Sequence, residues 1–161
     1  MLIKAPETVS AKYKPVIFLA GPIIGAPDWQ VEAFNIIHEL NASVLVASPR
    51  RSVIKDKLTP EDFEAQVTWE SIWLSRAAIT GCILFWLAKE TDHKCSRAYA
   101  QTTRFELGEW LSRGNNAQIV VGIEPGFTGE SYIRARLKLW KSPVQVVSTL
   151  KEACVIAVDY C

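Results

Sequence analysis

Glu106 is the residue whose type and spacing point most directly to chemistry. It lies in a stretch that follows the most apolar run of the sequence, and this stretch has the pattern of the first turns of a helix. Glu106 follows Thr103 by three residues, which is the spacing of a capping box, where the carboxylate returns to the backbone amide of the capping residue. A carboxylate on a first turn is also kept ionised by the helix dipole and can serve as a nucleophile. From the spacing alone, capping is the commoner of these two roles.

Other chemically capable side chains also have ordinary structural explanations. A residue in the position of Glu70 is more often a solvated helix acid than a catalytic one, and a pair such as Arg50 and Arg51 is more often a surface pair than an anion site. Six tryptophans are a high number for 161 residues, and several stand beside the predicted strand ends. Large aromatic residues are usually core residues, and an aromatic-lined pocket for a flat heteroaromatic ligand is the alternative. The tryptophans concerned are Trp29, Trp69, Trp73, Trp86 and Trp110.

Short apolar runs alternate with amphipathic segments along the chain. The apolar runs predict buried strands at residues 15–20, 43–47, 80–87, 117–123 and 144–147. The amphipathic segments predict helices at residues 29–40, 59–78, 103–114 and 130–140 and from residue 148 onward. Such alternation predicts an α/β fold with a five-stranded parallel sheet and helices on both faces. We expect one domain over residues 1–161, with residues 1–14 as an irregular N-terminal tail.

The composition is that of an ordinary globular protein, with 49% hydrophobic and 22% charged residues. A net charge of +1 gives no electrostatic reason to expect nucleic acid or an anionic membrane as a partner. The first 14 residues lack the apolar segment of a secretory signal, and the longest apolar run, Cys82–Ala88, is too short to span a bilayer. We therefore expect a cytoplasmic protein.

Signatures of bound cofactors or metals are missing from the sequence. The loop Gly21-Pro22-Ile23-Ile24-Gly25 lacks the spacing of a dinucleotide-binding fingerprint. His93 and Cys95 are near neighbours, but the chain has two histidines and no Cys-x-x-Cys pair, which disfavours zinc ligation. We expect neither a cofactor nor a metal.

The predicted topology also gives the place of a site. In an open α/β sheet, ligands bind outside the carboxyl ends of the strands, where the strand order reverses. Three segments leave such strand ends: residues 21–29, residues 48–51 and the loop that leads to residues 103–106. We therefore expect these three segments to meet at one site.

Several short motifs in a fixed order carry a family resemblance. They are Phe18-Leu19-Ala20-Gly21-Pro22-Ile23, Trp29, Pro49-Arg50-Arg51, Gln66-x-x-Trp69-Glu70, Ile83-Leu84-Phe85-Trp86-Leu87, Thr103-Arg104-Phe105-Glu106-Leu107-Gly108-Glu109-Trp110 and Val120-Val121-Gly122. Together they resemble the nucleoside 2-deoxyribosyltransferase-like family, in its branch with a Thr-Arg-Phe-Glu-Leu-Gly pattern. The resemblance extends over residues 16–133 and implies a flavodoxin-like, Rossmann-like three-layer sandwich.

The resemblance implies a glycosyltransferase that exchanges the base of 2′-deoxyribonucleosides, as in nucleotide salvage. It places the nucleophile at Glu106, whose carboxylate attacks C1′, expels the base and holds the deoxyribosyl group as a covalent ester until a second base accepts it. Glu70 matches a second acid that positions the sugar or the proton of the leaving base. The implied partners are a deoxynucleoside, a free nucleobase and further copies of the chain in a homo-oligomer with shared active sites. The implied substrate-binding residues are Phe18, Gly21, Pro22, Asp28, Trp29, Pro49, Arg50, Trp69 and Arg104.

Two departures from the family pattern keep other functions open. Phe18 stands where family members often carry a tyrosine that orients the nucleophile, and residues 98–103 contain no acid before Glu106. One alternative is an N-glycoside hydrolase of deoxynucleosides or their 5′-monophosphates, in which Arg50 and Arg51 grip a phosphate. The other alternative is a non-catalytic nucleotide-binding or sensing domain.

Overall fold

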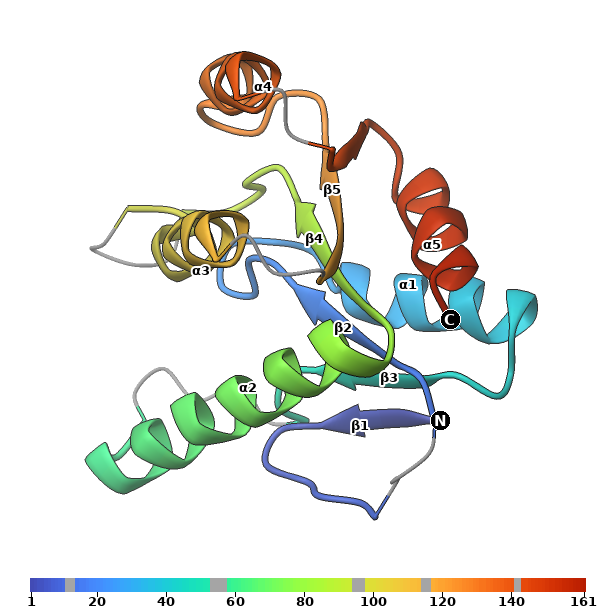
Figure 1. The fold of residues 1–161 in the computed structure, drawn as a ribbon. Coiled ribbons are helices and arrows are strands. Elements are labelled where there is room, and N and C mark those ends of the chain that lie inside the picture. Colours follow the sequence, from blue (N-terminus) through green and yellow to red (C-terminus); the bar gives the residue numbers. More distant parts are fainter. Residues whose placement is uncertain (11–13, 53–57, 94–97, 114–116, 141–142) are drawn as a thin grey trace.

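In the residues that the computed structural model describes, six parallel strands form one sheet (Figure 1). The structure describes residues 1–10, 14–52, 58–93, 98–113, 117–140 and 143–161. The strands are β1 (Leu2–Lys4), β2 (Val16–Ala20), β3 (Leu45–Ser48), β4 (Cys82–Leu87), β5 (Gln118–Ile123) and β6 (Gln145–Val147). They lie in the order β1-β3-β2-β4-β5-β6 across the sheet.

Helices cover both faces of this sheet. They are α1 (Trp29–Leu40), α2 (Pro60–Thr80), α3 (Gln101–Ser112), α4 (Glu130–Leu139) and α5 (Leu150–Asp159). Helices α2, α3 and α4 lie on one face, and α1 and α5 lie on the other (Figure 1). The predicted α/β class with a parallel sheet between two helical layers is therefore confirmed, and the arrangement is flavodoxin-like.

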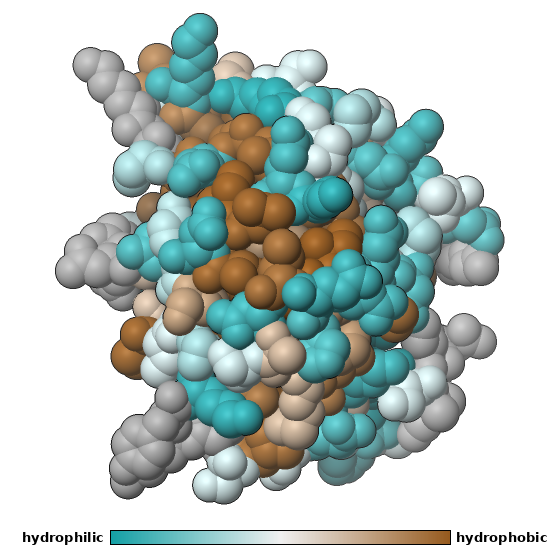
Figure 2. Space-filling model, turned by 90° about the vertical axis from the view of Figure 1, so that its right-hand side faces the viewer, coloured by the Kyte–Doolittle hydropathy of each residue, from teal (hydrophilic) through white to brown (hydrophobic). Residues whose placement is uncertain are grey.

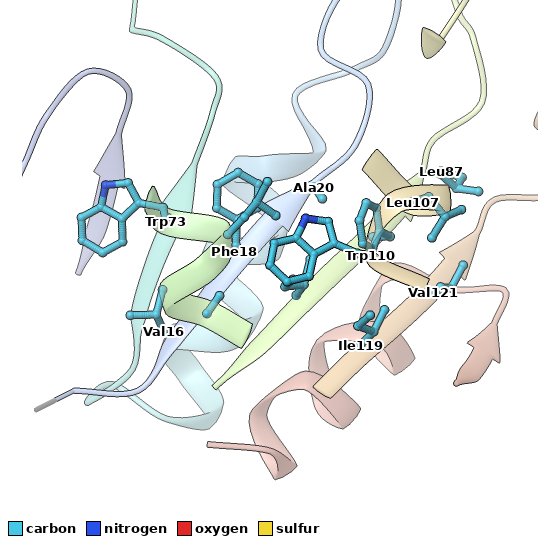
Figure 3. Packing of buried hydrophobic residues seen from close by; sticks show 14 of the residues in the cluster. Val16, Phe18, Ala20, Trp73, Leu87, Leu107, Trp110, Ile119 and Val121 are labelled. Carbon is cyan, nitrogen blue, oxygen red and sulfur yellow. The ribbon is translucent and has the colours of Figure 1, made fainter. Parts of the chain in front are cut away.

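Side chains of the central strands alternate between the two helical layers. In β2, Phe18 points toward α2 and α3, whereas Ile17 and Leu19 point toward α1 and α5. Figure 3 shows Phe18 between Trp73 of α2 and Trp110 of α3, with all three side chains buried. Because both faces of each central strand are covered, β2 and β4 are apolar throughout rather than alternating.

The first strand corrects two expectations, the five-stranded sheet and the irregular N-terminal tail. Leu2–Lys4 forms β1, which pairs in parallel with β3 and places Ile3 opposite Ala47. Ile3 is fully buried in the core on the α2 side. A strand of three residues is too short to display a periodic pattern, and its strand conformation depends on pairing with β3, which lies far along the chain.

The strand order reverses between β2 and β4. From β2 the chain crosses to β3 on one side, and from β4 it continues to β5 and β6 on the other side. The carboxyl ends of β2 and β4 are therefore the place where an open α/β sheet binds a ligand. The following loops lead into α1 and α3, as the sequence predicts.

Hydrophobic side chains gather near the middle of the face that carries α5 and α1, surrounded by hydrophilic ones (Figure 2). On this side Val147, Val155 and Ile156 line a groove of about 380 Å³ along β6 and α5. In the part of the chain that the structure describes, no helix is both long and apolar enough to cross a membrane.

Candidate active site

Glu106 lies on the second turn of α3, one turn further into the helix than its sequence predicts. The helix begins at Gln101, because Ala100 adopts a left-handed backbone conformation with φ of 55° and its carbonyl accepts the first helical bond, from Arg104 N. Thr103 is buried inside the first turn and caps nothing. The predicted capping box at Thr103 is therefore wrong, and the helix dipole acts on Glu106 less than at a first turn.

The carboxyl group of Glu106 lies in a poorly solvated position beside other acids. Burial raises its pKa to about 8, and the negative charges of Glu70 and Glu109 add to this rise. Within the described ranges, no hydrogen-bond donor reaches its side chain. Glu106 therefore favours its protonated form near neutral pH, contrary to the expectation of a carboxylate kept ionised by the helix dipole.

Glu70 of α2 shares this region but has different neighbours. Burial also raises its pKa, while a hydrogen bond from Gln66 and the charge of Arg51 oppose the rise. Gln66 Nε2 donates to Glu70 Oε1 at 2.7 Å. The two carboxyl groups are thus electrostatically coupled, and Glu70 is the one whose raised pKa is held back by a hydrogen-bond donor and a cation.

Gln66 is fixed from two further directions. Its Nε2 also donates to the carbonyl of Pro49 at 2.9 Å, and its Oε1 accepts a hydrogen bond from Arg51 Nε at 2.8 Å. Arg51 in turn donates to the carbonyl of Asp62 at 2.8 Å. Pro49, predicted to bind substrate, therefore contributes a carbonyl that orients Gln66 after the end of β3.

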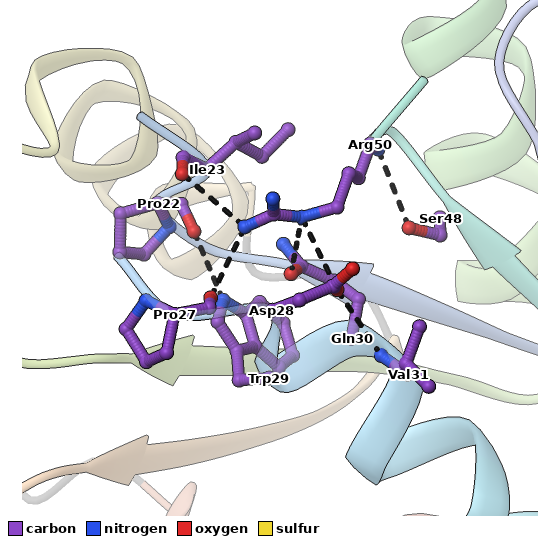
Figure 4. Close-up of polar contacts among 9 residues, drawn as sticks. All are labelled: Pro22, Ile23, Pro27, Asp28, Trp29, Gln30, Val31, Ser48 and Arg50. Atoms are coloured by element: carbon purple, nitrogen blue, oxygen red, sulfur yellow. Dashed lines mark hydrogen bonds and ion pairs between the residues drawn. The ribbon is translucent and has the colours of Figure 1, made fainter. Parts of the chain in front are cut away.

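Arg50 holds the loop between β2 and α1, as Figure 4 shows. Its Nε donates to Gln30 Oε1 at 2.9 Å and lies 3.3 Å from Asp28 Oδ1. Its Nη2 donates to the carbonyls of Ile23 and Pro27 at 3.2 and 3.1 Å. Asp28 caps α1 by accepting from the backbone N–H of Val31. The side chains of Arg50 and Asp28 therefore stabilise the loop between β2 and α1.

The predicted positions Gly21, Pro22 and Trp29 shape the same loop. Trp29 Nε1 donates to the carbonyl of Pro22 at 2.9 Å, and its ring is buried on the α1 side. A Cβ atom on Gly21 would lie 2.3 Å from the carbonyl oxygen of Trp86 and 2.5 Å from the Trp29 ring. Glycine is therefore required at position 21 by the close approach of β4 and α1.

Aromatic residues near the site are core residues. Trp69 packs at 6.1 Å from the Phe18 ring and 5.9 Å from the Trp73 ring, measured between ring centroids. Its Nε1 donates to the carbonyl of Glu7 at 2.6 Å. The five tryptophans singled out from the sequence are all at least 95% buried, which confirms the core interpretation over the aromatic-lined pocket. Phe18 and Trp69 are both buried in the core between the sheet and α2.

Arg104 joins α3 to the loop that follows β5. Its guanidinium donates to the carbonyl of Thr128 and lies 4.6 Å from the centroid of the Phe127 ring. Its Nε donates to the carbonyl of Tyr99, so both of these hydrogen bonds go to backbone carbonyls. Arg104 thus orients α3, the helix that carries Glu106.

The loops after β2 and β4 are tied to each other. The carbonyl of Gly25 accepts hydrogen bonds from the Thr91 backbone N–H at 2.8 Å and from its hydroxyl at 3.1 Å. Tyr99, just before α3, donates its hydroxyl to the carbonyl of Ala88 at 2.8 Å. Hydrogen bonds therefore join the two loops where the chain leaves β2 and β4.

Metal ligation finds no support among residues 1–10, 14–52, 58–93, 98–113, 117–140 and 143–161, where no three His, Cys, Asp or Glu side chains come together. Cys95, weighed with His93 as a ligand, lies outside the described residues. A hollow of about 270 Å³ between α4 and β6 is lined by Arg134, Leu137, Lys138, Val144 and Val146, away from the carboxyl pair.

Gln66 and Arg51 contact or face Glu70, a role that was not predicted for them from the sequence. Gln66 belongs to the motif that ends in Glu70, and its position four residues earlier places both side chains on one face of α2. The four-residue spacing on a predicted helix could have indicated the hydrogen bond between Gln66 and Glu70. Nothing in the local sequence indicates that Arg51, from another segment, orients Gln66.

The structure is an α/β protein with a parallel sheet, and two of its acids, Glu70 of α2 and Glu106 of α3, interact electrostatically. Residues 14–127 match the family model described as nucleoside 2-deoxyribosyltransferase like. This match covers more than half of the chain, so the chain belongs to the nucleoside 2-deoxyribosyltransferase-like family. No curated protein matches the chain significantly.

Proposed function

We propose that this protein is a nucleoside 2-deoxyribosyltransferase, in which Glu106 is the nucleophile and Glu70 is its acid–base partner. The observation that carries the proposal is the electrostatic coupling of these two carboxyl groups, which come from two helices on the same face of the sheet. Family membership supplies the reaction class. Retaining glycosidases use the same pair of roles, one carboxylate as nucleophile and the other as acid and base.

One proton shared by the pair serves the first half of the reaction. In the free protein it resides mainly on Glu106, since burial and the charge of Glu70 raise the pKa of Glu106 to about 8. When the deoxynucleoside binds, Glu70 accepts this proton, and Glu106 becomes a carboxylate next to C1′. An ionised Glu106 can then stabilise the positive charge that develops on the sugar.

The covalent step balances within the pair and the substrate. A Glu106 oxygen forms a bond to C1′, the N-glycosidic bond breaks, and its electron pair leaves with the base. Glu70 returns its proton to the departing base. A second base then attacks C1′ by the reverse route: it loses a proton to Glu70, and the ester to Glu106 breaks.

Hydrolysis is the second candidate, with water in place of the acceptor base. The arginine contacts favour a nucleoside over a 5′-monophosphate in either reaction. Arg50 is engaged by Gln30, Asp28 and two loop carbonyls, and Arg51 by Gln66 and Asp62. Using either guanidinium to grip a phosphate would cost these charge-assisted hydrogen bonds.

A homo-oligomer with shared active sites remains part of the proposal. Phe105, next to Glu106, is 74% exposed, and Phe63 on α2 is 58% exposed. Exposed aromatic residues beside a site are typical of surfaces that another chain covers. Light scattering on the wild type and on Phe105→Ser tests this: the wild type forms the oligomer, and the variant shifts toward monomer.

Base exchange is the experiment that tests the function. The protein is incubated with thymidine or deoxyinosine, with and without adenine, and products are separated by chromatography. A new deoxynucleoside that requires adenine supports the transferase, and free base without exchange supports the hydrolase. No turnover of any deoxynucleoside would favour the sensing domain. Thymidine 5′-monophosphate in place of thymidine tests the preference for unphosphorylated substrate. A transferase of this kind fits a cytoplasmic role in nucleotide salvage.

A further inference from the structure

We propose that Gln66, oriented by Arg51, is a positioning residue that keeps Glu70 ionised and directed toward Glu106, ready to accept its proton. The inference rests on the proposed function for its catalytic meaning, but the charge state of Glu70 is measurable without turnover. Neither Gln66 nor Arg51 contacts substrate in this account; both act through Glu70.

The side-chain amide of Gln66 can adopt only one orientation. Its Oε1 accepts from Arg51 Nε, which has no acceptor capacity, so its Nε2 must face the other way. There it donates to Glu70 Oε1 at 2.7 Å and to the carbonyl of Pro49 at 2.9 Å. A flipped amide would set two donors against each other at Arg51 and two acceptors at Glu70.

The Gln66 Nε2 donor, fixed at 2.7 Å from Glu70 Oε1, favours the charged form of Glu70. A carboxylate accepts such a bond more strongly than a neutral acid does. Arg51 adds a positive charge behind the amide, and it is held there by the carbonyl of Asp62 and by the Asp62 carboxylate at 3.7 Å. The relay Arg51–Gln66–Glu70 therefore opposes the burial that would otherwise neutralise Glu70.

Glu106 differs from Glu70 in its charged neighbours and, within the described residues, in its lack of a hydrogen-bond donor. Its charged neighbours are Glu70 on α2 and Glu109 on its own helix, both negative, whereas Glu70 faces Arg51 as well as Glu106. Glu106 has no hydrogen-bond donor among the described residues. One member of the pair is thus supplied with a donor and a cation, and the other with neither, which separates their proton affinities.

A second buried glutamine provides a matched control for the hydrogen bond between Arg51 and Gln66. Gln30 is also a buried glutamine whose Oε1 accepts from an arginine, Arg50 Nε, at 2.9 Å. Its Nε2 has no hydrogen-bond partner in the described part of the chain. Gln30→Met therefore removes a buried Gln–Arg bond of the same kind without touching Glu70.

Carboxyl titration by carbon-13 NMR of glutamate-labelled protein tests the proposal. We expect Gln66→Met and Arg51→Met each to raise the titration midpoint of Glu70 by about one pH unit. Gln30→Met should leave that midpoint unchanged. An unchanged Glu70 midpoint in Gln66→Met would overturn the proposal. If Gln66→Met does not fold, Arg51→Met decides by the same criterion.

Kinetics separates this inference from the proposed function. In Gln66→Met the acid limb of the pH profile of kcat/KM should move to higher pH, because Glu70 takes up its own proton earlier. A lower rate with an unchanged profile would contradict the positioning role. If the wild type turns over no deoxynucleoside, the proposed function fails, while the NMR midpoints still decide the charge state of Glu70.

Discussion

Gln66 Nε2 lies 2.7 Å from Glu70 Oε1, whereas no donor of the described residues reaches the side chain of Glu106. This asymmetry gives two coupled acids different proton affinities although both are poorly solvated. In the proposed mechanism the proton of the pair resides mainly on Glu106, and Glu70 is the base that accepts it. Chemistry that must move one proton from a nucleophile to a leaving group needs such a difference.

The pH dependence of kcat/KM should be bell-shaped, with an alkaline limb near pH 8. Above that pH the free protein loses the proton of Glu106, whose pKa is raised to about 8, and none remains for the leaving base. Below the optimum, protonation of Glu70 removes the acceptor. Initial rates of base exchange measured from pH 5 to 9.5 give both limbs.

Glu109→Gln provides the control for this assignment. The charge of Glu109 helps to raise the pKa of Glu106, so its removal should move the alkaline limb to lower pH. An alkaline limb that stays in place in this variant would assign it to another group.

Glu106→Gln should become more stable than the wild type as the pH rises from about 4.5 to 8. In that range the folded wild type holds a proton on Glu106 that the unfolded chain has lost, so its free energy of unfolding falls with pH. The glutamine variant lacks this dependence, and above pH 8 the difference levels off. Urea titrations at pH 5, 6.5 and 8.5 measure it; a difference independent of pH would contradict the raised pKa.

Ala100→Gly should stabilise the protein. Ala100 has φ of 55°, a conformation that costs a residue with a Cβ about 1–2 kcal/mol and glycine little. The matched control is Ala65→Gly, an exposed position inside α2, where glycine should destabilise by about 0.5–1 kcal/mol. Thermal unfolding of both variants checks the opposite signs, and destabilisation by both would show that Ala100 is unstrained.

Arg50→Met should destabilise the loop between β2 and α1. The change leaves the buried Gln30 acceptor and the partly buried carbonyls of Ile23 and Pro27 without their donor, at a cost of about 1–3 kcal/mol. Arg136→Met, which removes a cation–π contact with the exposed Trp140, should cost less than about 1 kcal/mol. Equal unfolding midpoints for the two variants would contradict the bracing role of Arg50.

The sheet and its helical layers could be predicted because continuous apolar runs are what doubly covered parallel strands require. β2 and β4 are such runs, and their alternation with capped helices fixes the fold class. β1 escaped prediction because Ile3 is buried by pairing with Ala47, more than forty residues away.

The candidate site was predicted less completely because its details depend on tertiary contacts. The interval from Thr103 to Glu106 satisfies the capping-box spacing, but the backbone of Ala100 starts the helix earlier. Arg50 has the residue type of an anion site, and only the fold shows that it braces a loop. The coupling of Glu106 and Glu70 depends on the placement of α2 and α3 on the same face of the sheet, which no local sequence pattern contains.

The most direct test of the central claim is the mass of the intact protein after incubation with a deoxynucleoside alone, followed by peptide mapping. We expect an added deoxyribosyl group on Glu106 of the wild type, together with release of one equivalent of base. The Glu106→Gln variant should carry no such group. Loss of the side chain in Glu106→Ala should also reduce turnover by several orders of magnitude while far-UV circular dichroism stays unchanged. Base exchange that proceeds at normal rates in the Glu106 variants, or an adduct on another residue, would contradict the account.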